Sequence, residues 1–274
     1  MSGNPPAALR NGAGWETVLR APAQGQHVAQ LYSERRFLFH AVGEFVGAGL
    51  RRGEAVLLIL TPAHRHPIVR QLEGQGFTLG DLSRRRQLTI LDATPTLAEL
   101  LVGGLPNRER FQLVIGGAVE AARAAGYRKL RSFGEMVDVL RRTSLTATLQ
   151  LEALWSELVL AHGMALLCGY SIDNFDPDTY QGILQGVSRA HSHLVPVEDY
   201  ARLERAVERA YAEVFGVGRD AGFLRRAFLA HYPRPAMMPD AEAAILAARE
   251  FVPAAASTLL ERIRHHYQSS APTA

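Results

Sequence analysis

The sequence predicts an α/β protein with a mainly parallel sheet flanked by helices, followed by an all-helical C-terminal appendage. From residue 27 onward, short β-like runs alternate with helical stretches, which is the pattern of βαβ units. The strongest run, residues 55–60, is continuously apolar, as expected of a strand covered on both faces. After Pro196 the strand-like runs stop, and Ala-, Arg- and Glu-rich helical patterns replace them.

About five parallel strands are predicted, each a short apolar run bounded by turn residues. They cover residues 27–32, 55–60, 88–91, 129–133 and 164–170. Helical patterns follow the strands at residues 37–50, 62–72, 97–101, 111–125, 136–142, 145–162 and 178–190. Ser33 and Thr61 stand where helix caps are expected, and Gly53 stands where a helix should end. The crossovers between the strands should be right-handed.

Composition divides the 274 residues into three parts. Residues 1–23 are rich in Pro, Gly, Ala and Asn, and we expect a flexible leader there. Residues 24–196 form the predicted α/β domain, and residues 197–274 form the helical appendage. The helical patterns of the appendage cover residues 198–215, 221–231 and 241–265, and three prolines between 233 and 239 divide them into two groups.

The composition favours a soluble cytoplasmic protein with no membrane partner. Hydrophobic residues make up 47% and charged residues 21%, which allows a sizeable core. The sequence has neither a long apolar run nor a signal-peptide pattern. Its one cysteine, Cys168, cannot form an intrachain disulfide, and we expect it to be buried and inert. The formal net charge of +3 does not by itself indicate nucleic-acid binding.

Phosphate-binding machinery is missing from the sequence. A Walker A loop needs a glycine-rich turn and a lysine followed by Ser or Thr. Lys129 is the only lysine, and it precedes a predicted strand with no Ser or Thr after it. No G-x-G-x-x-G segment opens a helix after a strand either. The sequence therefore argues against P-loop ATP hydrolysis.

Six segments, taken together, resemble the MEDS family, the sensory domain named for methanogens, methylotrophs and the dichloromethane regulator DcmR. They are residues 53–64, 91–94, 131–136, 151–155, 166–170 and 190–196. Residues 53–140 also resemble KaiC-type ATPases. The resemblance implies a RecA/KaiC-like fold without a P-loop, and a ligand sensor for small organic or hydrocarbon-derived molecules. Residues 61–64 stand where KaiC-like proteins carry acidic residues, so the catalytic carboxylates are missing as well.

Candidate ligand-binding residues lie mainly at the carboxyl ends of the predicted strands, where doubly wound sheets bind ligands. The set is Tyr32, Thr61, His64, Asp92, Arg131, Glu135 and Trp155. Arg131 and Glu135 would bind a polar head group of the ligand, or would form a structural ion pair. Asp92 is as well suited to a turn or cap, and Trp155 to core packing.

The sequence indicates no catalytic set, no cofactor and no metal site. His191 and His193 form an H-x-H pair, but a metal would need a third and a fourth donor of suitable geometry. A histidine pair held in a loop or interface is the favoured interpretation.

The sequence therefore predicts a non-enzymatic cytoplasmic sensor or regulatory protein. It would bind a small organic ligand at the strand ends and signal through the C-terminal helices to a partner protein or to the second subunit of a homodimer. Two alternatives stay open: an interaction or scaffold module with a closed pocket, and a DNA-binding transcriptional regulator. Residues 211–226 have a helix-turn-helix-like spacing, but Gly222 and Arg225 fall where apolar residues should be buried.

Overall fold

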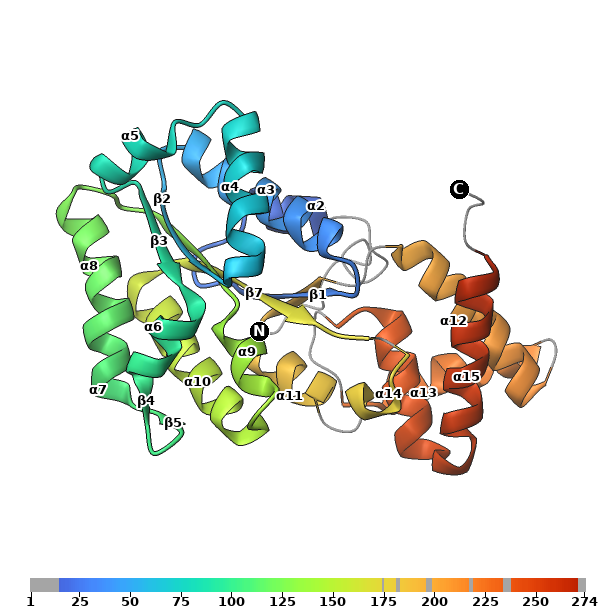
Figure 1. The fold of residues 1–274 in the computed structure, drawn as a ribbon. Coiled ribbons are helices and arrows are strands. Elements are labelled where there is room, and N and C mark those ends of the chain that lie inside the picture. Colours follow the sequence, from blue (N-terminus) through green and yellow to red (C-terminus); the bar gives the residue numbers. More distant parts are fainter. Residues whose placement is uncertain are drawn as a thin grey trace.

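The computed structural model describes residues 15–173, 175–180, 183–195, 199–216, 219–233 and 238–270. Its main sheet has six parallel strands in the order β3-β2-β6-β7-β1-β8 (Figure 1). The strands are β1 (His27–Tyr32), β2 (Ala55–Leu60), β3 (Leu88–Asp92), β6 (Leu130–Gly134), β7 (Ala165–Ser171) and β8 (His193–Val195). The predicted parallel α/β sheet is confirmed. The sequence missed the short edge strand β8 and the hairpin of β4 (Leu101–Val102) and β5 (Leu105–Pro106).

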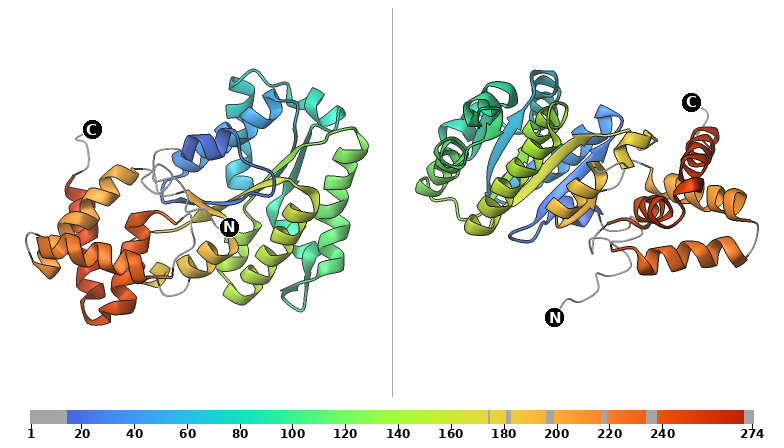
Figure 2. Two further views of the ribbon diagram at one scale, coloured as in Figure 1. Left: turned by 180° about the vertical axis from the view of Figure 1, so that it is seen from behind. Right: turned by 90° about the horizontal axis from the view of Figure 1, so that it is seen from below.

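Helices cover both faces of the sheet, because alternate residues of each strand point to opposite sides. Ala29 and Cys168 belong to one core cluster, whereas Val28 and Leu167 belong to the other. The Val28 face is covered by α2 (Trp15–Arg20), α3 (Arg35–Arg51), α4 (Pro62–Gly74) and α5 (Leu79–Arg84). The Ala29 face is covered by α6 (Ala93–Leu100), α7 (Arg108–Phe111), η1 (Gln112–Gly116), α8 (Gly117–Ala124), α9 (Met136–Arg141), α10 (Leu145–His162) and α11 (Ile183–Ala190). Figure 2 shows this arrangement from two further sides.

The N-terminal leader predicted for residues 1–23 is partly corrected by the structure. Residues 1–14 lie outside the described residues, but Trp15–Arg20 form α2. Trp15, Val18 and Leu19 recur three to four residues apart and are buried in the core against α3. This segment is therefore part of the folded α/β domain.

Four helices form the C-terminal region, and they confirm the predicted all-helical appendage (Figure 1). They are α12 (Tyr200–Phe215), α13 (Arg219–His231), α14 (Asp240–Phe251) and α15 (Pro253–Ser269). The single helix expected over residues 241–265 is divided at Val252, because Pro253 cannot continue the backbone hydrogen bonding of the preceding turn. A short 3-10 segment, η2 (Pro177–Tyr180), precedes α11. Across the described ranges, no helix combines the length and the apolar character needed to cross a bilayer.

Candidate functional site

A pocket of about 310 Å3 lies at the carboxyl edge of the sheet. Tyr32 ends β1, Thr61 follows β2 and Glu135 follows β6, so three parallel strands deliver these side chains to the same edge. The full lining consists of Tyr32, Arg35, Thr61, Ala63, His64, Glu135, Asp138, Val139 and Arg142. The pocket therefore occupies the position where ligands of open α/β sheets bind.

The Glu135 carboxylate is held by hydrogen bonds at both oxygens. The Thr61 backbone N–H donates to Oε2 at 2.8 Å and the Thr61 hydroxyl donates to the same oxygen at 3.1 Å. The other oxygen, Oε1, contacts Nδ1 of His64. Glu135 is only 3% exposed, so its charge is stabilised by these donors and little by water. Thr61 is the N-cap of α4, but its hydroxyl serves Glu135 instead of capping the helix.

This contact determines the tautomer of His64 when the ring is neutral. A carboxylate only accepts hydrogen bonds, so the proton of the neutral imidazole is on Nδ1 and Nε2 is left as an acceptor. Two aromatic rings meet His64 edge-on, with centroid distances of 5.4 Å to Phe39 and 6.3 Å to Tyr32. Among the described residues, no hydroxyl or thiol is hydrogen-bonded to His64, so the Glu135–His64 pair lacks the nucleophile of a hydrolytic triad.

The lining of the pocket also carries both signs of charge, from Asp138 and from Arg35 and Arg142. Asp138 accepts from Nη2 of Arg141 at 2.9 Å and from Nη2 of Arg142 at 3.4 Å. Burial, and after it the carboxylates of Asp138 and Glu135, raise the pKa of Tyr32 well above its ordinary value, so this phenol stays protonated at neutral pH. Arg35, at the start of α3, is exposed and makes no ion pair with any described residue. The site can therefore offer an imidazole acceptor, a phenol and an unpaired guanidinium to a ligand.

Four of the seven predicted ligand-binding residues come together in this pocket: Tyr32, Thr61, His64 and Glu135. Two of the others have structural contacts elsewhere. Asp92 caps α6 by accepting from the Thr94 N–H at 3.0 Å. Trp155 is 1% exposed and meets Phe111 edge-to-face with a centroid distance of 5.2 Å, which is the core-packing alternative.

Arg131 also lies outside the pocket, and its predicted position beside Glu135 is corrected. Its side chain forms an ion pair with Glu54, which precedes β2, at the amino ends of the strands. It also donates to the carbonyl oxygens of Leu19, Phe45 and Arg20 at 3.1, 2.9 and 3.2 Å. The structural ion pair, which was the alternative interpretation, is the role that the contacts support.

Arg35, Asp138 and Arg142 line the pocket but were not predicted from the sequence. They lie in or next to the helices that follow β1 and β6, at or beyond the first turn. A search that had included the first two helical turns after each strand would have found them. Choosing candidates only at the last residue of each strand, or directly after it, was too narrow a criterion for the pocket lining.

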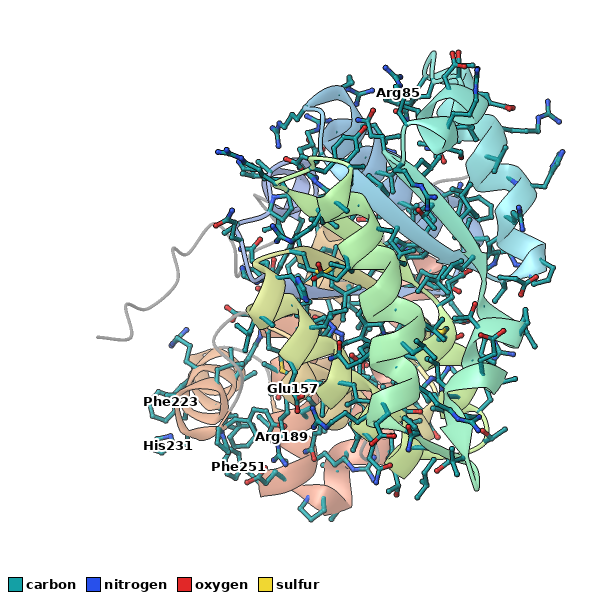
Figure 3. All side chains as sticks on the ribbon, turned by 90° about the vertical axis from the view of Figure 1, so that its left-hand side faces the viewer. Arg85, Glu157, Arg189, Phe223, His231 and Phe251 are labelled. Carbon is teal, nitrogen blue, oxygen red and sulfur yellow. The ribbon has the colours of Figure 1, made fainter. Side chains whose placement is uncertain are left out.

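A second and larger cavity, about 390 Å3, lies among the C-terminal helices. Its Arg225 is paired with Glu208 at 3.1 Å and with Glu204 at 3.6 Å. Arg225, which falls at a position where a helix-turn-helix would bury an apolar residue, is thus engaged by carboxylates within its own region. On the surface of these helices, Phe223 and Phe251 are 64% and 39% exposed (Figure 3).

Residues 26–191 match the family model described as "MEDS: MEthanogen/methylotroph, DcmR Sensory domain". The matched region is more than half of the chain and contains the pocket up to Arg142. The chain belongs to the MEDS family. This confirms the resemblance found in the sequence and assigns the protein to a family of sensory domains.

Comparison with other proteins adds two findings about this MEDS protein. No curated protein sequence matches it. Among solved structures, it is similar to a KaiC-like protein from the hyperthermophilic archaeon Pyrococcus horikoshii OT3, with 15% identity and a TM-score of 0.38. That match covers 53% of this chain and 62% of the archaeal chain.

Proposed function

We propose that this MEDS protein binds a small organic ligand in the pocket at the carboxyl edge of the sheet and signals its presence without transforming it. The observation that supports the proposal most directly is the Glu135–His64 contact. It fixes one ring nitrogen of His64 and leaves the other as a hydrogen-bond acceptor for a ligand. A buried, pre-oriented polar group of this kind gives a pocket its specificity.

The charges of the pocket favour a small organic acid that also carries a hydroxyl or amide donor. The donor would reach Nε2 of His64, and the acid would reach Arg35, which has no ion pair among the described residues. Val139 and Ala63 supply apolar surface between these groups. The volume of about 310 Å3 is at the low end for small-molecule sites, so the ligand should be short.

A continuous set of contacts supports a path from the pocket to the C-terminal helices. The Ile172 N–H donates to the carbonyl oxygen of Tyr32 at 3.0 Å. Next along the chain, Asp173 lies 3.8 Å from the guanidinium of Arg264, and the same guanidinium donates to the Phe175 carbonyl oxygen at 2.7 Å. Arg264 belongs to α15, so a ligand that shifts Tyr32 would change the position of this helix on the α/β domain. We propose that this movement of α15 is the signal passed to a partner.

A ligand screen tests this function. Short-chain carboxylic and hydroxy acids are added to the purified protein, and a rise in melting temperature identifies binders, whose affinity is then measured by calorimetry. His64→Gln should weaken binding by about tenfold or more, because the fixed acceptor is lost. His66→Gln, an exposed histidine two residues along the same helix, is the matched control and should bind as the native protein does.

Two results would contradict the proposal. Equal affinity in the native protein and in His64→Gln would remove the pocket from ligand recognition. Conversion of a bound acid to a product, followed by NMR, would contradict the non-enzymatic role. A screen without any binder would instead favour the alternative of an interaction module with a closed pocket.

A further inference from the structure

A second polar cluster lies inside the α/β domain, where residues of β1 and β7 meet residues of α10 and the end of α11. It consists of His27 at the start of β1, Glu152 on α10, Cys168 in β7 and His191 just after α11. One donor atom from each of the four residues lies within 4.8 Å of the others. All four side chains are buried, and none of them lines the pocket at the sheet edge.

The hydrogen bonds around the two histidines orient a ring nitrogen of each into the cluster. Nδ1 of His191 lies 2.7 Å from the Val187 carbonyl oxygen, which can only accept, so the proton of the neutral ring is on Nδ1. Nδ1 of His27 lies 3.0 Å from the Ser156 hydroxyl, which itself donates to the Ala190 carbonyl oxygen at 3.5 Å. When Ser156 accepts from the Nδ1–H of His27, the neutral rings of both histidines carry a free lone pair on Nε2.

These lone pairs face other acceptors. Nε2 of His191 lies 3.5 Å from Glu152 Oε1, and Nε2 of His27 lies 3.1 Å from Glu152 Oε2. His191 Nε2 and Glu152 Oε2 are among the buried atoms that have no hydrogen-bond partner within the described ranges. The Tyr170 hydroxyl donates to Glu152, and the Cys168 thiol lies beside His27 Nε2, but Glu152 Oε2 and His191 Nε2 have no donor among the described residues. Acceptors that converge in this way in a dry core cost free energy unless something positive lies between them.

Individual contacts in the cluster are close to the donor spacing of a tetrahedral metal centre, and all four donor atoms lie within 4.8 Å of one another. Bonds of about 2.0–2.3 Å from Zn2+ to nitrogen, oxygen and sulfur place neighbouring donors about 3.3–3.8 Å apart. Nε2 of His27 lies 3.4 Å from Cys168 Sγ and 3.1 Å from Glu152 Oε2. Nε2 of His191 lies 3.5 Å from the other carboxylate oxygen, Glu152 Oε1. The outer contacts fit as well, because metal-bound histidines usually donate their second N–H to an oxygen. The Tyr170 hydroxyl donates to Glu152 in the same supporting way.

We propose that His27, Glu152, Cys168 and His191 bind one divalent transition-metal ion, of which Zn2+ fits the donor set best. Two nitrogens, one thiolate and one carboxylate complete four-coordination and leave no open position, which is typical of a structural centre. The ion would join β1 and β7 to α10 and to the start of the segment that leads into β8. Since the cluster is sealed, the metal would enter while the chain folds. This site is independent of the ligand pocket and of the sensor function.

Metal analysis of the intact protein tests the proposal. Untagged protein is produced in zinc-supplemented medium and, in parallel, in cobalt-supplemented medium, and metal per chain is measured by mass spectrometry. We expect one zinc per chain in the first sample. We expect in the second the visible bands of tetrahedral Co2+ together with a thiolate-to-cobalt charge-transfer band in the near ultraviolet.

One ligand variant and one control variant test whether Cys168 binds the metal. Cys168→Ser, which keeps the size of the side chain, should abolish the charge-transfer band and reduce bound metal at least tenfold after dialysis. His193→Gln is the matched control: it alters the neighbouring histidine, which contacts Ser192 and Gln26, and should retain the metal. If Cys168→Ser fails to fold, the metal content and the cobalt spectrum of the native protein still test the proposal. Folded native protein with far less than one metal per chain in both media, and without the cobalt–thiolate band, would overturn the proposal.

Discussion

The α/β domain and the C-terminal helical region differ in how they accommodate buried charge. In the α/β domain, Arg131 is 2% exposed, forms an ion pair with Glu54 and donates to three carbonyl oxygens. Glu152, fully buried, lies between two histidines and accepts from Tyr170. In the helical region, Glu242 is fully buried, and neither carboxylate oxygen accepts a hydrogen bond from any other described residue.

The pKa directions follow these surroundings. Burial raises the pKa of Glu152, but His191, His27 and Tyr170 lower it by more, so the net direction is down. The pKa of Glu242 is raised to about 7, chiefly by burial; its own backbone N–H opposes the rise, and the acidic neighbours Glu204 and Asp240 add to it.

The reason for the difference is the composition of the elements. The sheet places cations and carbonyl groups of neighbouring segments at fixed positions. Gly49 leaves space for the Arg131 side chain, because a Cβ at position 49 would lie 2.8 Å from that side chain. Around Glu242, α14 is built largely from buried alanines, whose side chains are apolar. The helical region therefore contains a buried acid whose protonated form is favoured.

Replacement of Arg131, the buried arginine of the α/β domain, should change the free energy of unfolding most. Arg131→Met leaves Glu54 and three carbonyl oxygens without their donor, so we expect a loss of about 3–5 kcal/mol in the free energy of unfolding. Denaturant titration measures it. Arg128→Met, at an exposed position three residues earlier, is the control and should change stability by less than about 0.5 kcal/mol. A loss below about 1 kcal/mol for Arg131→Met would contradict the structural role assigned to this side chain.

Replacement of Glu242, the buried acid of the helical region, should raise the free energy of unfolding. The pKa of Glu242 is higher in the folded protein, about 7, than its ordinary value of 4.5. Its contribution to stability is therefore complete below pH 4.5, declines as the pH rises toward 7, and stays low above that. Glu242→Gln lacks this titration, so it should be more stable than the native protein at pH 8 by about 2–3 kcal/mol and nearly equal to it near pH 4.5.

Thermal unfolding of both proteins across this pH range measures the difference. Glu250→Gln changes an exposed acid on the same helix and should follow the native curve. A gain for Glu242→Gln that is the same at every pH would mean that the carboxyl group has a normal pKa, and the contrast between the two regions would fail.

The sequence predicted most of the sheet because its central strands are continuous apolar runs, as in residues 55–60. It missed β8, which has three residues and only one neighbour, β1. It also joined two helices across Val252, although Pro253 was visible in the sequence. The π-helical segment of residues 112–116 was predicted as ordinary helix, because no local signal in the sequence distinguishes the two.

Whether a pocket residue could be predicted depended on where it lies relative to the end of its strand. Glu135 and His64 follow strands directly, and the parallel sheet brings such residues to one edge. Arg131 is four residues before Glu135, and on an extended strand that is about 13 Å, so the two lie at opposite ends of β6. The cluster around Glu152 could not be foreseen, because its four members come from distant segments that only the fold brings together.

The smallest effect should come from the same substitution in the helical region. Arg225 is paired with Glu204 and Glu208, but the side chain of Glu208 is 59% exposed and that of Glu204 is 29% exposed. Water and salt screen such pairs, so Arg225→Met should cost about 0.5–1 kcal/mol, and the cost should shrink further in 1 M salt. Denaturant titration at low and high salt, run beside Arg131→Met, measures both arginines on one scale. A loss for Arg225→Met as large as that for Arg131→Met would mean that the helical region also depends on paired charge, and that Glu242 is its exception.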